Sequence, residues 1–148
     1  MVHTIAVMSS FNFSHAPGHL IRRAHQSSMA IFAQEMAQFD VTAVQFAILQ
    51  VLLDSPGADQ VTVAQLVAFD AATSGSVIGR LEARGWLRKE LDVLDKRRKL
   101  LWLTPEGRAA ALKMKRPVQK VQDKLLAPLN AQERLHLMDL LARVSDAA

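Results

Sequence analysis

The amino-acid sequence predicts a mainly α-helical fold that contains one small β-hairpin. Over most of the chain, apolar residues recur at three- and four-residue steps, which is the period of an amphipathic helix. Several of these segments begin with a helix-capping pattern. Residues 87–103 differ, because two short apolar-rich runs flank a strongly basic tip there. Such a pattern is typical of two strands joined by a turn.

The first two helices have clear boundaries in the sequence. We expect a first helix at about residues 17–38, where Pro17 suits the first helical position. Thr42-x-x-Gln45 forms a capping box that opens a second, nearly all-apolar helix. The run Asp54-Ser55-Pro56-Gly57 consists of turn-forming residues and ends it.

Two shorter helices are expected before the hairpin. Thr62-x-x-Gln65 is expected to open the third helix. The fourth, at about residues 72–84, has two candidate caps, Asp70 and Thr73.

Two further helices are expected after the hairpin. Thr104-Pro105 opens the fifth, and Asn130-x-x-Glu133 opens the last. Pro117 lies inside the fifth helix and is expected to kink it, or to break it at Arg116.

Length and composition limit the class of protein. A chain of 148 residues favours a single domain, 1–148, with a real hydrophobic core. No apolar run approaches the ~20 residues of a membrane span. The chain has no cysteine, which excludes disulfides, thiolate nucleophiles and Cys-ligated zinc. Residues 1–15 lack the features of a secretory signal, and we expect a cytoplasmic protein.

The positive charge is concentrated in one segment. The whole chain carries a net +4, from 18 basic and 14 acidic residues. Residues 80–99 alone hold eight basic and four acidic side chains, again +4. A localised basic segment is the electrostatic footprint of a nucleic-acid binder. A solvated charged hairpin is the alternative interpretation.

The order of the elements favours nucleic-acid binding. Two helices separated by about three residues and followed by a hairpin form the plan of a winged helix-turn-helix. Segments 81–87 (Leu-Glu-Ala-Arg-Gly-Trp-Leu), 95–97 (Asp-Lys-Arg) and 103–107 (Leu-Thr-Pro-Glu-Gly) resemble the signature of the MarR family of transcriptional regulators. The resemblance covers nearly the whole chain. It implies a DNA-binding core at residues 40–104, with the wing at about 87–103.

The resemblance also implies roles for single residues. Arg97 would enter a narrow minor groove, and Asp95 would hold the wing by pairing with a neighbouring arginine. Lys96, Arg98 and Lys99 would contact phosphates. The fourth helix would supply the other candidate DNA contacts, Thr73, Ser74, Ser76 and Arg80.

Two glycines lie inside the fourth helix, Gly75 and Gly79. Each costs about 0.5–1 kcal/mol relative to alanine. Close approach to DNA is one explanation, and tight packing against the third helix is the other. We favour packing for Gly79 and leave Gly75 open.

The outer helices, 17–38 and 105–148, are expected to form a dimerisation layer. They carry more apolar side chains than one small winged domain needs. The candidate dimerisation residues are Leu125, Leu126, Leu129, Leu135, Met138 and Leu141. Symmetric pairing would place two recognition helices ~34–36 Å apart on an inverted-repeat operator. The alternative is that these leucines complete a monomer core.

One face of the first helix is a candidate site for a small-molecule effector. His19, Arg22 and Gln26 lie at i, i+3 and i+7, where they can hold a carboxylate against an apolar wall that includes Phe32. The full candidate set is His15, His19, Arg22, Arg23, Gln26, Met29 and Phe46. Residues 18–26 also resemble a branch whose members often sense aromatic acids or their coenzyme A thioesters, which implies an aromatic carboxylate. Surface ion pairing of the two arginines is the alternative.

Catalysis, a cofactor and a metal site are not expected. The sequence has no Gly-rich phosphate loop, no Gly-x-Ser-x-Gly and no His-Glu-x-x-His. His15 and His19 have metal-pair spacing, but Pro17 places His15 outside the helix and no third ligand is evident. We therefore expect a homodimeric repressor that an effector releases from a palindromic operator. A winged-helix protein-interaction module without operator binding is the alternative.

Overall fold

The computed structural model describes residues 11–68 and 70–147 of the chain. Its elements are η1 (Phe13–His15), α1 (Pro17–Glu35), η2 (Ala37–Phe39), α2 (Ala43–Asp54), α3 (Gln60–Leu66), α4 (Ala71–Ala83), β1 (Leu87–Leu91), β2 (Lys99–Leu103), α5 (Pro105–Leu125) and α6 (Ala131–Asp146). The predicted fold, mainly helical with one two-stranded antiparallel sheet, is confirmed. The prediction of no secretory signal falls largely on residues 1–10, which lie outside the described residues.

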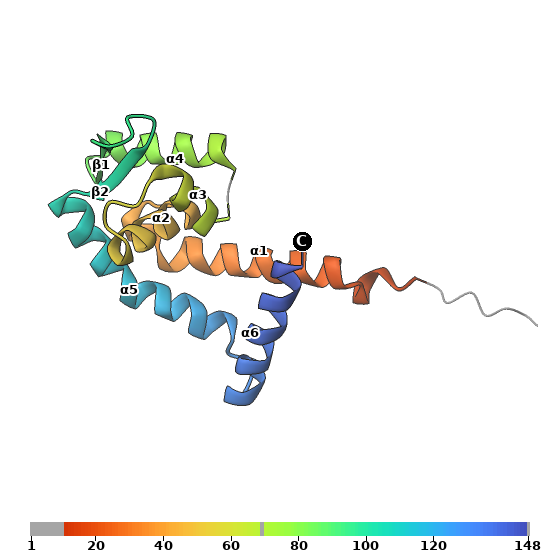
Figure 1. Cartoon of the computed structure of the whole chain (residues 1–148). Coiled ribbons are helices and arrows are strands. Elements are labelled where there is room, and N and C mark those ends of the chain that lie inside the picture. The colour runs from red at the N-terminus through yellow and green to blue at the C-terminus, as the bar shows by residue number, and fades with distance from the viewer. Residues whose placement is uncertain (1–10, 69, 148) are drawn as a thin grey trace, which may run out of the picture.

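The outer helices differ in their relation to the winged body, because α1 and α5 share its core whereas α6 contributes no buried residue. In Figure 1, α2, α3, α4 and the hairpin gather into one body, and α1 runs past it. From the base of the hairpin, α5 leads away toward α6, which stands apart from that body. No helix in the described part of the chain has both the length and the apolar character needed to cross a membrane.

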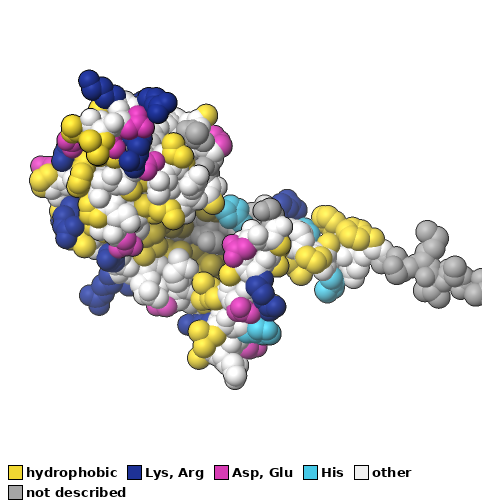
Figure 2. Space-filling view, in the orientation of Figure 1, with side chains coloured by type: hydrophobic (Ala, Val, Ile, Leu, Met, Phe, Trp, Pro, Cys, Tyr) yellow, Lys and Arg dark blue, Asp and Glu magenta, His cyan; other side chains and the backbone are white. Residues whose placement is uncertain are grey.

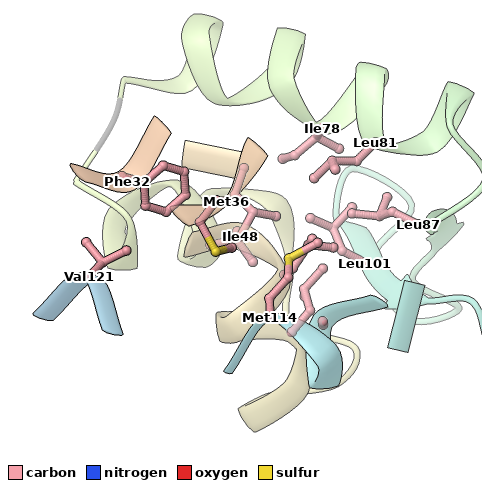
Figure 3. Close-up of a cluster of buried hydrophobic side chains, with 13 residues drawn as sticks. Phe32, Met36, Ile48, Ile78, Leu81, Leu87, Leu101, Met114 and Val121 are labelled. Carbon is pink, nitrogen blue, oxygen red and sulfur yellow. The ribbon is translucent and has the colours of Figure 1, made fainter. Parts of the chain in front are cut away.

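One hydrophobic core lies inside the winged body. It takes side chains from α1 through α5 and from both strands, and Figure 3 shows them converging. Its members are Phe32, Met36, Ile48, Leu49, Leu52, Val63, Ile78, Leu81, Leu87, Leu101, Ala111, Met114 and Val121. Because the wing and α4 are anchored in the same core, their relative position depends on packing rather than on a flexible connection.

The hairpin is attached to the helices along one edge. β1 pairs with β2 in a register that runs from Leu87–Leu103 to Leu91–Lys99. On the other edge of β2, the Leu101 N–H donates to the Ala58 carbonyl at 2.9 Å, and the Gly57 N–H donates to the Leu101 carbonyl at 2.9 Å. The connection between α2 and α3 therefore pairs with the wing like a short third strand.

Most of the predicted helix boundaries are confirmed. The capping boxes of α2, at Thr42 and Gln45, and of α6, at Asn130 and Glu133, are both complete. The structure also decides between the two candidate caps of α4. Asp70 is the N-cap, and Thr73 donates to it.

Two predicted boundaries differ from the structure, since α1 ends at Glu35 instead of at about residue 38 and α3 begins earlier than expected. Thr62 does not open α3, because Asp59 is the N-cap and accepts from both the Thr62 N–H (3.0 Å) and the Thr62 hydroxyl (2.8 Å). The helix therefore begins at Gln60, and Thr62 lies inside its first turn. Of the two outcomes expected at Pro117, a break at Arg116 does not occur, since α5 runs on to Leu125.

The segment 103–107 joins the base of the wing to α5. The Thr104 hydroxyl donates to the Gly85 carbonyl at 2.6 Å and accepts from the Gly107 N–H at 3.0 Å. A Cβ on Gly107 would lie 1.9 Å from the Trp86 carbonyl oxygen. Gly85 has φ +82°, a conformation that suits glycine. The Leu-Thr-x-x-Gly pattern therefore marks the place where the start of α5 passes close to the backbone of Gly85 and Trp86.

Candidate nucleic-acid interface and effector site

The solvent-facing side of α4 carries polar side chains. Thr73, Ser76 and Arg80 are exposed. Ser74 is fully buried, and its hydroxyl has no partner among the described residues. The prediction that Ser74 contacts DNA is therefore wrong for this conformation. At a period of 3.6 residues Ser74 shares the inner face of α4 with the core residue Ile78.

The start of α4 is held by a strong cap. The Thr73 N–H and hydroxyl each donate to Asp70 at 2.8 Å. These two hydrogen bonds hold the pKa of Asp70 below its usual value. Thr73 thus fixes the end of α4 while its side chain remains at the surface.

The two glycines of α4 have different surroundings. A Cβ on Gly75 would lie 3.4 Å from the Gln60 side-chain nitrogen, in ordinary contact with α3. A Cβ on Gly79 would meet no described atom within 4 Å. The explanation of Gly79 by tight packing is therefore wrong, because its position has room for a side chain.

We expect Gly79→Ala to raise the free energy of unfolding by about 0.5–1 kcal/mol, because alanine lowers the entropy cost of the helix without a clash. Urea denaturation followed by tryptophan fluorescence measures the change. Lower stability in this variant would contradict the open space at Gly79.

The wing tip presents Arg97 to solvent. Its side chain is 92% exposed, yet its Nε lies 3.2 Å from Asp95 Oδ1, and its backbone N–H donates to the same oxygen at 3.0 Å. Asp95 thereby shapes the turn that carries Arg97. Lys96 and Lys99 are exposed and form no ion pair with any described side chain. Figure 2 shows Lys and Arg side chains projecting at the end of the molecule that holds α4 and the hairpin.

Arg98 lies between two carboxylates. Its Nη1 is 3.0 Å from Asp92 Oδ2 and its Nη2 is 3.1 Å from Asp59 Oδ2. The Thr62 N–H and hydroxyl, and then Arg98, lower the pKa of Asp59 to about 2. The same pairing raises the pKa of Arg98. The charge of Arg98 is thus largely compensated within the chain.

Arg84 is a positioning residue that the sequence reasoning missed. Its guanidinium donates to the Asp40 carbonyl at 2.7 Å and the Phe39 carbonyl at 2.5 Å, and lies 3.7 Å from the centre of the Trp86 ring. It thereby ties the turn between α1 and α2 to the base of the wing. Counting charges could not separate this arginine from Arg97, because both lie in the same basic segment.

The effector candidates are only partly brought together. His19 Nδ1 lies 3.3 Å from Arg22 Nη2, and the His19 ring is 4.3 Å from the ring of Phe13. These three residues help line an open hollow of about 440 Å³, in which Phe11, Ala16, Pro17 and Gly18 also take part.

The other effector candidates do not line that hollow. His15 lies in η1, outside α1, as the position of Pro17 indicates. Arg23, Gln26 and Met29 are exposed, and Phe46 packs against Phe32 at the margin of the core. No group of three or more possible metal-ligating His, Asp or Glu side chains occurs among the described residues.

The last helix has an uncovered apolar face. No described residue of α6 is buried. Leu135, Met138 and Leu141 are 74%, 59% and 40% exposed. The alternative that these three side chains complete a monomer core is therefore wrong. Leu125, Leu126 and Leu129 are half-buried.

Comparisons with known proteins match this arrangement. A family model described as "MarR family" matches residues 39–98, which span α2, the two helices that follow it and most of the wing. The transcriptional regulator HosA of Escherichia coli is 33% identical over 130 residues, covering 85% of this chain and 92% of HosA. The transcriptional repressor NicR of Pseudomonas putida is 32% identical over 130 residues, covering 88% of this chain and 82% of NicR.

A solved structure is similar over almost the whole chain. It is the structure of BpsR from Bordetella bronchiseptica, a protein whose DNA binding is regulated by 6-hydroxynicotinic acid. The two chains superpose with a TM-score of 0.89 and 38% sequence identity, covering 93% of this chain and 99% of BpsR.

Proposed function

The chain belongs to the MarR family of DNA-binding transcriptional regulators, and on this premise we propose that it is a homodimeric repressor released from a palindromic operator by a small-molecule effector. One observation carries the proposal. The wing and α4 are anchored in the same hydrophobic core. The wing tip exposes Arg97 almost fully to solvent, and α4 exposes Thr73, Ser76 and Arg80. The polar face of α4 suits the major groove of a DNA duplex, and the basic tip of the wing suits the adjacent minor groove.

In the proposed complex α4 lies in the major groove and the wing follows the neighbouring minor groove. Arg97 enters the minor groove, where a narrow A·T-rich segment has enhanced negative potential. Lys96 and Lys99 contact phosphates, which adds affinity without sequence preference. Asp95 keeps the turn in shape.

Dimerisation is proposed through residues 17–38 and 105–148, with the exposed face of α6 at its centre. An apolar face of this kind favours a self-complementary contact between two copies. A dimer would present two copies of α4 to the two halves of an inverted repeat. NicR, which is named a repressor, supports the direction of the regulation.

The effector is proposed to be an aromatic carboxylate held by His19 and Arg22. The hollow beside α1 offers a cation, an imidazole and the phenyl ring of Phe13, which together suit an aromatic acid. The name of the BpsR structure includes such an acid, 6-hydroxynicotinic acid. Release then requires that the effector bind a dimer conformation whose recognition helices no longer fit the operator.

The test of DNA binding compares the unmodified chain with Arg97→Ala on duplexes from its own upstream region across a salt series. We expect tight binding that weakens steeply with salt. The variant should bind about 5- to 150-fold more weakly, the range for one groove-reading arginine. Equal, weak binding of both proteins to this DNA and to random DNA would contradict operator binding and favour a protein-contact role for the wing.

The effector site is tested with Arg22→Gln. Loss of a charge-assisted hydrogen bond should weaken binding of 6-hydroxynicotinate by about 10- to 150-fold, with unchanged affinity for DNA. Isothermal titration calorimetry measures the binding. Arg23→Gln is the matched control, since Arg23 does not line the hollow. If the Arg23 variant loses binding and the Arg22 variant does not, the hollow is not the site.

A further inference from the structure

We propose that Arg98 is a positioning residue, which fixes the wing relative to α3 and α4 through Asp59 instead of contacting a phosphate. The inference rests on the proposed entry of Arg97 into the minor groove. It concerns how the protein holds Arg97 at the correct place relative to the recognition helix.

The contacts of Arg98 lie within the protein and join two elements. Asp92 belongs to the wing loop, while Asp59 is the N-cap of α3, thirty-nine positions earlier in the chain. Both carboxylates are largely covered, with side chains 15% and 18% exposed, whereas Arg98 itself is 52% exposed. A planar guanidinium can bond two carboxylates at once, which a lysine ammonium does less well.

The wing loop closes around the same residue. The Asp92 N–H donates to the Arg98 carbonyl at 3.1 Å, and the Arg98 N–H donates to the Asp95 carbonyl at 2.9 Å. Asp95 in turn shapes the tip that carries Arg97. Fixing the Arg98 side chain therefore also fixes the path of the chain on either side of the tip.

The connection continues from Asp59 to the recognition helix. Asp59 pairs with Leu100 of β2 in an isolated bridge. Its neighbour Gln60 lies where a Cβ on Gly75 of α4 would be in contact, at 3.4 Å from the amide nitrogen. Arg98 is thus bonded to the N-cap of α3, and the next residue of α3, Gln60, lies beside α4 at Gly75. A Cβ at Gly75 would make only an ordinary contact with Gln60, so nothing in the structure explains the glycine.

The decisive experiment uses the sign of a charge change. Asp59→Asn removes a negative charge close to the proposed DNA surface, so electrostatics alone predicts tighter binding. Asparagine is as good an N-cap as aspartate, so α3 keeps its start. If Arg98 fixes the wing through its bond to Asp59, the affinity of Asp59→Asn for DNA falls instead, on the order of fivefold. Glu90→Gln is the matched control, because Glu90 pairs within β1 with Arg88 and forms no hydrogen bond or ion pair with a described residue of α3.

Two Arg98 variants complete the design. Arg98→Lys keeps the charge but not the bidentate geometry, and we expect it to bind as weakly as Asp59→Asn. In the double variant, Asp59→Asn with Arg98→Gln, the losses should not add, because both substitutions break the same contact. The slope of log affinity against log salt should stay unchanged in all of them, since no phosphate contact is lost. The probe is the duplex that the unmodified full chain selects from a random-sequence library.

The opposite results would overturn the proposal. These are unchanged or tighter binding by Asp59→Asn, full activity of Arg98→Lys, or a salt slope reduced by about one phosphate in Arg98→Gln. Hydrogen exchange of the Asp92 and Arg98 amides, measured without DNA, should quicken in Asp59→Asn and not in Glu90→Gln. Unchanged exchange would also overturn it. If the unmodified chain selects no duplex, the proposed function fails, while the exchange measurement still decides whether Arg98 holds the wing.

Discussion

Gly107→Ala is expected to destabilise the protein by at least about 3 kcal/mol, a large part of the roughly 5–15 kcal/mol that stabilises a typical domain. The added methyl group would lie 1.9 Å from the Trp86 carbonyl oxygen and 2.9 Å from the Trp86 Cα. The obstacle is backbone, which cannot rotate aside as a flexible side chain can. The hairpin and α5 would have to separate at the point where the chain turns between them.

The neighbouring hydrogen bonds make that separation costly. Thr104 accepts from the Gly107 N–H and donates to the Gly85 carbonyl, while its own N–H donates to the Trp86 carbonyl at 3.1 Å. Moving Gly107 would break several of these bonds together.

Urea denaturation followed by fluorescence measures the effect of Gly107→Ala, because Trp86 lies at the junction. Gly18→Ala is the matched control. Gly18 is also a helical glycine, but a Cβ there would meet no described atom within 4 Å. Equal stability of the two variants would show that the crossing at Gly107 is not as close as the structure has it.

Leu135→Glu is expected to convert the proposed dimer to a monomer and to weaken binding to the proposed operator on the order of 100-fold or more. Leu135 is 74% exposed in the single chain, so a charge there costs the monomer little. At a symmetric interface the substitution places two carboxylates in apolar surroundings. A monomer contacts one half-site at a time, so the gain from linked binding of two half-sites is lost.

Sedimentation velocity reports the oligomeric state, and binding to the selected duplex reports the affinity. His136→Glu is the matched control, because His136 is exposed and lies about a quarter-turn away from Leu135 on α6, away from Met138. A Leu135→Glu protein that remains a dimer and binds DNA normally would exclude this face of α6 from the interface.

Local patterns predicted the elements well. The capping boxes at Thr42 and Asn130 and the Thr104-Pro105 start of α5 each involve groups within four residues of one another. The hairpin follows from two apolar-rich runs around a polar tip, and its two strands, Leu87–Leu91 and Lys99–Leu103, have the extent predicted for the wing. These elements can be predicted from the sequence because the interacting groups are neighbours in the chain.

Predictions that depended on depth or on distant partners were less successful. Ser74 and Ser76 look alike in sequence, but one is buried and the other exposed. The sequence favours tight packing at Gly79, but its surroundings are open. Arg97 and Arg98 are neighbours with the same charge, yet Asp59, far away in the sequence, pairs only with Arg98.

The sequence by itself determined the fold class, the order of the helices, the position of the wing and the family. These depend on local hydrogen bonds and on the period of apolar residues. Only the tertiary structure decided which basic side chains are engaged within the protein, which face of α4 is free, and why Gly107 admits no side chain. Those properties arise where segments far apart in the chain pack together, and the residue pattern of one segment does not identify the segment that packs against it.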